Sequence, residues 1–104
     1  MRALVVWTTA PDLREARKLA RFLVDRKLAA CVSLRSGFES VYSWKKKIET
    51  ASEILLVIKT SKAKWVDLEK MIRSRHSYKI PEVLAVEAAS GSKEYLNWIE
   101  SALR

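Results

Sequence analysis

Side chains alternate between apolar and polar types along residues 38–45. Phe38, Tyr42 and Trp44 fall on one side of this alternation, which is the period of a strand with two different faces. Residues 54–58 read Ile-Leu-Leu-Val-Ile, a continuous apolar run typical of a strand covered on both faces. The polar stretch from Lys46 to Ser52 lies between them and is predicted to turn the chain back. Residues 40–60 therefore predict one long antiparallel hairpin.

The predicted hairpin is long relative to a domain of this size. Two arms of about ten residues would each reach roughly 33 Å, whereas a domain of about 100 residues has a radius of gyration of only about 13 Å. The arms should therefore overhang their own core. Because exposed apolar side chains and open strand edges need cover, we expect other copies of the same chain to supply it.

The residues before the hairpin predict a strand, a helix and a second strand. An apolar run forms the first strand, Ala3 to Thr8. Pro11 suits a first helical turn, Asp12 with Glu15 resembles a capping box, and the apolar spacing continues to about Lys27. The second strand covers residues 29–35, and Ser36-Gly37 permits a bend or bulge before the strand resumes.

The residues after the hairpin repeat the order of helix and strand. Ser61 is predicted to cap a helix whose apolar face holds Trp65, Leu68, Met71 and Ile72. A loop over residues 76–81, a strand over 82–88 and a short helix around Tyr95, Trp98 and Ile99 complete the chain. The order β-α-β-β-α-β-α predicts an α+β fold, a ferredoxin-like βαββαβ sandwich with a long overhanging hairpin and an extra C-terminal helix. Residues 1–104 are predicted to form a single domain, with one sheet face left bare.

Composition narrows the class of protein. The 104 residues carry a formal net charge of +8 and include two glycines and one cysteine, Cys31. A lone cysteine forms no internal disulfide, which fits a reducing compartment, and the apolar start is too short for a signal peptide or membrane span. The cytoplasm is therefore expected, with no membrane partner. Because the basic residues are spread over the helices and the hairpin tip, a solvated surface is favoured over nucleic-acid binding.

Several motifs together resemble the CutA divalent-cation tolerance family, and the resemblance covers nearly the whole chain. They read Thr9-Ala-Pro11-Asp12, Leu28-Ala-Ala-Cys31, Tyr42-Ser-Trp44-Lys45 with Ile48-Glu49, Leu56-Val-Ile-Lys59-Thr60, His76-Ser-Tyr78-Lys-Ile-Pro81-Glu82 and Tyr95-Leu-Asn-Trp98. The resemblance implies a homotrimer whose hairpins cross between neighbours, and a role in tolerance of, or response to, metal ions such as copper. It implies no defined catalytic activity.

The chain departs from the pattern of that family at several positions. Ser77 and Lys79 stand where members commonly have Pro and Glu, and Lys46 stands where Gly is common. If the turn there needs a positive φ, Lys46 carries strain. A copper site attributed to some members would fall on Thr8, Arg75 and His76 here, so only one of its ligands is present.

The candidate metal ligands are His76, Glu82 and Cys31. A copper or zinc site needs three or four N, S or O ligands, so one chain offers too few and a site shared between subunits would be required. The alternatives without metal binding are a structural role for the histidine and packing of the cysteine as a small hydrophobic residue. No bound cofactor other than a divalent metal such as copper is indicated.

A second set of residues is assigned to the surfaces between subunits. Aromatic side chains on the hairpin are typical of interfaces, and Lys59 with Glu82 could form an ion pair that closes a cleft or could bind a small ion. The assigned residues are Tyr42, Trp44, Lys45, Glu49, Lys59, Thr60 and Tyr78.

Three function classes remain open. The leading hypothesis is a non-enzymatic homotrimer linked to divalent metal response. The alternatives are a small-molecule-sensing trimer similar to the PII signalling proteins and an RNA-binding module of RRM layout, although the third strand lacks the aromatic residues on which such a module stacks bases. No Ser-His-Asp set, activated Cys-His pair or Gly-rich phosphate loop indicates catalysis.

Overall fold

The computed structural model describes residues 1–104 and contains one sheet with three α-helices. The elements in chain order are β1 (Ala3–Ala10), α1 (Leu13–Asp25), β2 (Cys31–Trp44), β3 (Lys47–Ser61), a 3-10 turn (Lys62–Lys64), α2 (Trp65–Arg75), β4 (Leu84–Glu87) and α3 (Lys93–Ala102). The strand order is β2-β3-β1-β4, with every pair antiparallel. This is the predicted ferredoxin-like arrangement.

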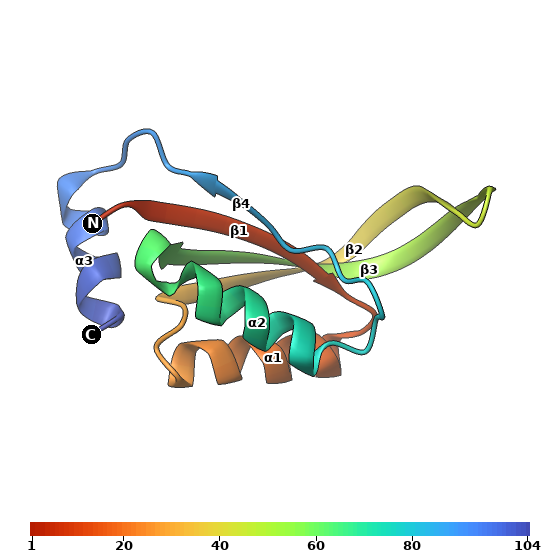
Figure 1. The fold of residues 1–104 in the computed structure, drawn as a ribbon, viewed down its shortest axis with the longest axis horizontal. Coiled ribbons are helices and arrows are strands. Elements are labelled where there is room, and N and C mark those ends of the chain that lie inside the picture. The colour runs from red at the N-terminus through yellow and green to blue at the C-terminus, as the bar shows by residue number, and fades with distance from the viewer.

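The core lies between the sheet and the two helices α1 and α2, which cover the same face of the sheet (Figure 1). Leu23 of α1, Leu68 and Ile72 of α2, and Leu56 and Ile58 of β3 are completely buried there. Each such side chain contributes about 1.5–3 kcal/mol through removal from water. None of the helices is both long and apolar enough to cross a membrane.

The other face of the sheet has no helical layer over its middle. Trp7 of β1 pairs with Val57 of β3 on one side and with Leu84 of β4 on the other, so all three point to this face. Leu84 is 64% exposed, and Val86 two residues on is 51% exposed. Helix α3 packs only at the end of the sheet near the two termini (Figure 1). An apolar strip therefore faces outward.

The hairpin of β2 and β3 runs well beyond the helices (Figure 1), as the sequence predicts. The molecule measures 44 × 26 × 24 Å, and its radius of gyration is 14.2 Å, above the roughly 13 Å of a compact domain this size. Val41 and Ile48 are 65% and 75% exposed near the tip, and the aromatic rings of Tyr42 and Trp44 are close to half exposed. The overhanging part has no cover within one chain.

The turn at the tip is shorter than the sequence predicts. Trp44 pairs with Lys47, so only Lys45 and Lys46 form the turn, and residues 47–52, expected within the turn, continue β3 instead. Most of these side chains are polar, so the sequence carries no sign of this strand, which is held by pairing with β2. Lys45 and Lys46 have φ values of 50° and 66°, as in a type I′ turn. The predicted bulge is present between Arg35 and Phe38, where Gly37 has φ 74°.

Replacing Lys46 by glycine is expected to stabilise the protein by about 0.5–1 kcal/mol per chain. A lysine in the left-handed region costs about 1–2 kcal/mol that glycine avoids, partly offset by the larger entropy of glycine in the unfolded chain. Urea unfolding at one fixed protein concentration measures the difference. Lys47→Gly is the matched control because it removes the same charge from a strand position, and it should lower stability; equal effects of the two variants would contradict the strain.

Several predicted boundaries differ from the structure; β1 continues to Ala10 rather than Thr8, and β2 begins at Cys31 rather than at residue 29. Ser61 is the last residue of β3, paired with Ala3, and its side chain caps no helix. Strand β4 covers only Leu84–Glu87, which pair with Leu4–Trp7 of β1, rather than residues 82–88. Helix α1 ends at Asp25 rather than near Lys27, whose φ of 58° lies outside the helical region.

Candidate functional site

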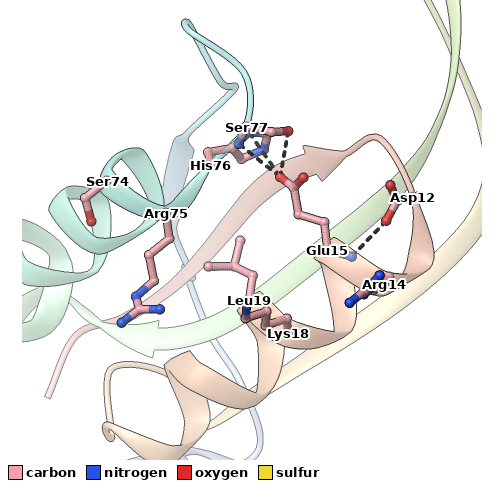
Figure 2. Close-up of a pocket in the computed structure, with 9 residues that line it drawn as sticks. All are labelled: Asp12, Arg14, Glu15, Lys18, Leu19, Ser74, Arg75, His76 and Ser77. Carbon is pink, nitrogen blue, oxygen red and sulfur yellow. Dashed lines mark hydrogen bonds and ion pairs between the residues drawn. The ribbon is translucent and has the colours of Figure 1, made fainter.

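Six polar residues gather where β1 ends, and we call them the polar cluster. They come from β1, α1, β3 and the loop that follows α2, so segments more than 60 residues apart in sequence meet there. Figure 2 shows three of them, Glu15, His76 and Ser77, with their contacts. The polar cluster comprises Thr9, Glu15, Glu53, His76, Ser77 and Tyr78.

The ring of His76 has both nitrogens engaged. The backbone N–H of Tyr78 donates to Nδ1 at 3.0 Å, so Nδ1 carries a lone pair and the proton lies on Nε2. Nε2 in turn donates to the backbone carbonyl of Thr9 at 2.6 Å. Glu15 lies 3.6 Å from Nδ1, but with the proton on the other nitrogen this contact is not an ion pair. The buried, neutral imidazole ties the end of α2 to the end of β1.

Glu15 holds the same loop from the side of α1. Its Oε2 accepts hydrogen bonds from the backbone N–H and the hydroxyl of Ser77, at 3.1 and 3.0 Å. The predicted capping box is therefore half formed: Asp12 accepts from the Glu15 N–H at 2.8 Å, while the Glu15 side chain turns to Ser77. A proline at position 77 would make neither bond with Glu15, because it lacks both donors.

Glu53 is the buried carboxylate of the polar cluster, with 7% of the residue exposed. Its Oε2 accepts from the hydroxyl of Tyr78 at 2.7 Å and from that of Thr9 at 3.2 Å. Both donors are uncharged hydroxyl groups, so the carboxylate is stabilised by their dipoles and not by a neighbouring cation. Glu53 therefore joins β3 to β1 and to the loop that carries Tyr78.

The surroundings of Tyr78 raise its pKa above the ordinary value for tyrosine. Burial is the largest cause, followed by its hydrogen bond to the Glu53 carboxylate and the repulsion between that charge and a phenolate. Tyr42 on the hairpin and Glu15 add smaller effects in the same direction. Tyr78 is thus held as a hydrogen-bond donor.

Stability should fall more steeply above about pH 10 in the natural protein than in Tyr78→Phe. Below about pH 10, the pKa of tyrosine in the unfolded chain, Tyr78 keeps its proton in both states and its contribution to the free energy of unfolding is complete. As the pH rises further, only the unfolded chain loses the proton, so the folded state becomes less stable relative to it. The loss should be about 1.4 kcal/mol per pH unit, on top of the changes common to both proteins. Urea unfolding at about pH 9, 10 and 11 measures it, and parallel curves for the two proteins would contradict the raised pKa.

A cavity of about 510 Å³ opens beside the polar cluster, between α1 and the end of α2 (Figure 2). Its walls are mostly charged or polar. They are formed by Asp12, Arg14, Glu15, Lys18, Leu19, Ser74, Arg75, His76 and Ser77. Because His76 and Glu15 are already hydrogen-bonded to the chain, the structure gives them a positioning role for the loop.

The three candidate metal ligands do not form a cluster within one chain. His76 lies at the end of β1, and Cys31 lies at the start of β2, where its Sγ is 3.7 Å from the hydroxyl of Tyr95. That hydrogen bond raises the pKa of Tyr95. Glu82 is exposed, and no group of three His, Cys, Asp or Glu side chains is placed to hold a metal ion. The residues of one chain therefore do not fit a copper site, and the assignment stays a prediction.

The copper site that the family resemblance would place at Thr8, Arg75 and His76 also lacks its ligands here. Thr8 is fully buried, and its hydroxyl has no hydrogen-bond partner. Arg75 stacks on the ring of Phe22, and His76 has no free nitrogen. The three matching positions therefore offer no side-chain atom that is free to bind copper in this chain.

The residues assigned to subunit surfaces fall into two groups in the structure. Tyr42 and Glu49 are direct cross-strand partners and share a hairpin face with Trp44, while Lys45 lies in the turn. Tyr78 borders that face through Glu53, which pairs with Phe38. These positions remain open to a neighbouring chain.

Two of the assigned residues are placed differently from the hairpin group. Thr60 is completely buried and donates to the carbonyl of Leu28 at 2.7 Å, so its side chain is used inside the chain. Lys59 makes no ion pair with Glu82, one of the two alternatives considered for these residues.

Sequence reasoning missed Thr9, Glu15 and Glu53 as members of one site. Glu53 gave a signal, since it is an acidic residue directly before the buried run Ile54–Ile58, and a carboxylate at such a position needs hydrogen-bond partners. The partners themselves carried no local signal. They are brought together by contacts between residues 25 to 67 positions apart.

Comparison with known proteins agrees with the fold and the motifs. The family model described as CutA1 divalent ion tolerance protein matches residues 4–102. The chain is 37% identical to the divalent-cation tolerance protein CutA of Thermus thermophilus, over 91% of this chain and 92% of that protein. It is 40% identical to the chloroplastic protein CutA of Arabidopsis thaliana over 98% of this chain, but spans only 56% of that relative's length.

Solved structures give the same result in three dimensions. CutA1 from Oryza sativa superposes with a TM-score of 0.97 at 36% identity, covering 100% of this chain and 95% of that one. CutA from Xylella fastidiosa gives 0.95 at 38% identity, covering 98% of both chains. The match extends over the sheet, the helices and the overhanging hairpin, and the chain belongs to the CutA1 divalent ion tolerance family.

Proposed function

We propose that this chain acts as a homotrimer in tolerance of divalent cations such as copper, without catalysing a reaction. The observation that carries the proposal is the overhanging hairpin, whose apolar and aromatic side chains are exposed in one chain. Membership of the family supports the role, because relatives over their full length are named divalent-cation tolerance proteins.

The apolar surfaces that a single chain leaves exposed support the proposed self-association. The hairpin tip, with Val41 and Ile48, and the sheet face, with Leu84, are apolar surfaces of the kind that protein interfaces bury. The family resemblance implies three chains, with each hairpin laid on a neighbour. The free Cys31 has no disulfide partner, and we place the trimer in the cytoplasm, where thiols stay reduced.

Direct metal binding would need ligands from more than one subunit. Glu82 is exposed and Cys31 is partly exposed, so both are available in principle to a site completed by a neighbour. His76 would first have to give up a hydrogen bond to Thr9 or Tyr78. An indirect role, in which the trimer acts on a partner in the metal response, requires none of these residues.

Growth in elevated copper tests the proposed function. A bacterial strain that lacks its own family member should regain copper tolerance when it expresses this chain. A variant with Asn-Gly in place of residues 41–50, which removes the hairpin tip, should not restore growth. Failure of the natural chain to restore growth, when it is expressed and folded, would contradict the proposal.

Calorimetry with Cu(II) on the metal-free protein separates the direct role from the indirect one. If subunits share a site, heat should be released on binding, and the combined variant Cys31→Ser/Glu82→Gln should reduce it. An absence of heat up to millimolar copper would reject direct binding and leave only the indirect role.

A further inference from the structure

The positive charge of this protein is concentrated on its helical layer. Residues 12–27 and 62–75, which form α1, α2 and their ends, hold eleven of the twenty Lys and Arg residues but only five of the twelve acidic ones. Helices α1 and α2 cover the sheet face opposite to the open one, and the hairpin tip extends beyond them (Figure 1). Neither self-association through the hairpin nor cation tolerance requires this excess of positive charge.

An open hollow of about 870 Å³ lies within this basic layer, between α1 and the edge strand β2. Its volume falls within the range of ligand sites, about 300–1,000 Å³. Half of its ten lining residues are apolar, and most of the others are cationic. The apolar residues are Ala20, Phe22, Val24, Val32 and Leu34, the cationic ones are Arg17, Lys18, Arg21 and Arg75, and the single acidic residue is Asp25.

Arg75 is held over this hollow by an aromatic ring. The centre of its guanidinium lies 3.5 Å from the ring centroid of Phe22, and that of Arg26 lies 4.7 Å from the same ring. These are cation–π distances. Figure 2 shows the Arg75 side chain running from the end of α2 away from Glu15, and Arg75 makes no ion pair. Its N–H donors therefore remain available while its position is fixed.

The other arginine in the last turn of α2 behaves differently. Arg73 pairs with Glu69 one helical turn before it, and its charge is balanced there. The four cations at the hollow make no ion pairs in the chain. They repel one another, and an anion placed among them would remove that repulsion and accept charge-assisted hydrogen bonds. This arrangement of unpaired cations is typical of an anion-binding site.

We propose that this hollow binds a small organic anion, with a carboxylate or phosphate group held by Arg75 and Arg21 and an apolar or aromatic body against Phe22, Val32 and Leu34. The anionic group would bind the arginine side chains through charge-assisted hydrogen bonds. The apolar body would add contacts with the apolar residues that an inorganic anion cannot make. None of its lining residues belongs to the hairpin tip or to the polar cluster, so the proposal stands independently of the proposed role in cation tolerance.

Calorimetry with four probes tests the chemistry of the site on the natural protein. The probes are 1-naphthyl phosphate, 1-naphthoate, inorganic phosphate and 1-naphthol. At least one of the two naphthyl anions should bind about tenfold or more tightly than inorganic phosphate and 1-naphthol, which corresponds to about 1.4 kcal/mol; comparing the two anions identifies the preferred charged group. Affinity should fall between about 50 and 500 mM NaCl because the contact is ionic.

Variants test the location. Arg75→Gln should weaken binding of the preferred naphthyl anion about tenfold or more, because a charge-assisted contact is lost, and Phe22→Leu should weaken it as well by releasing Arg75. Arg73→Gln on the same helix is the matched control and should stay within about twofold of the natural protein. NMR spectra should show shifts confined to α1, β2 and the end of α2, and circular dichroism checks that each variant is folded.

Several results would overturn the proposal. They are equal affinity for inorganic phosphate and both naphthyl anions, no effect of Arg75→Gln in a folded variant, or NMR shifts centred on the hairpin tip, residues 41–50. Tighter binding of duplex RNA or anionic lipid vesicles than of either naphthyl anion, with the same loss in Arg75→Gln, would also reject it, because the basic layer would then serve a macromolecular surface.

Discussion

A chain in which Asn-Gly replaces residues 41–50 will be a monomer in solution. The replacement joins Ser40 to Ala51, which are already cross-strand partners, through dipeptide chemistry suited to a type I′ turn. It removes the exposed Val41, Tyr42, Trp44 and Ile48 while leaving the core between the sheet and the helices intact. Because stable interfaces bury about 1,200 Å² or more, the shortened arms should leave too little surface for association.

Light scattering on the shortened chain measures this effect, and circular dichroism shows whether it is folded. The control keeps both arms and changes only Lys45-Lys46 to Asn-Gly, so it carries the same turn sequence on the natural hairpin. This control should remain associated and gain stability. A shortened chain that associates as the natural protein does would show that the hairpin tip is not what holds the copies together.

Replacement of Glu53 by alanine should cost about 2–4 kcal/mol of stability per chain. The hydroxyls of Tyr78 and Thr9 both donate to its Oε2, and hydrogen bonds to a charged group contribute about 1.5–3 kcal/mol each. Removal of a carboxylate that is costly to bury offsets part of the loss. Urea unfolding at one fixed protein concentration gives the value.

Companion variants locate the origin of that cost. Glu53→Gln keeps an acceptor oxygen and should lose less than Glu53→Ala, while Glu100→Ala on the exposed side of α3 should change stability by less than about 0.5 kcal/mol. The double variant Glu53→Ala/Tyr78→Phe should be less destabilised than the sum of the single changes, because both remove the same bond. Additive effects would show that the two residues do not act together.

The sequence alone was sufficient for the order of helices and strands along the chain and for the overhang, because both depend on local periodicity. The alternation of Phe38, Tyr42 and Trp44 and the apolar run from Ile54 were enough to predict the two arms. The turn was misplaced because Lys45-Lys46 contains neither glycine nor asparagine, the usual signals of positive φ. Residues 47–52 are mostly polar, with Ile48 as their one large apolar side chain, so they carry little hydrophobic periodicity.

The polar cluster could not be predicted, because it depends on contacts between distant segments. His76 was noticed as the single histidine, but its bonds to Thr9 and Tyr78, which leave no nitrogen free, follow only from the path of the loop. The same holds for the stacking of Arg75 on Phe22. Local pattern predicts which elements form; the packing of α1, α2 and β1 decides which side chains meet.

The mass of the purified protein in solution tests most directly the central claim that other copies of the chain cover the overhanging hairpin. Multi-angle light scattering at micromolar concentration should give three times the chain mass of 11.9 kDa. A folded particle of 11.9 kDa that keeps its hairpin exposed would contradict the account.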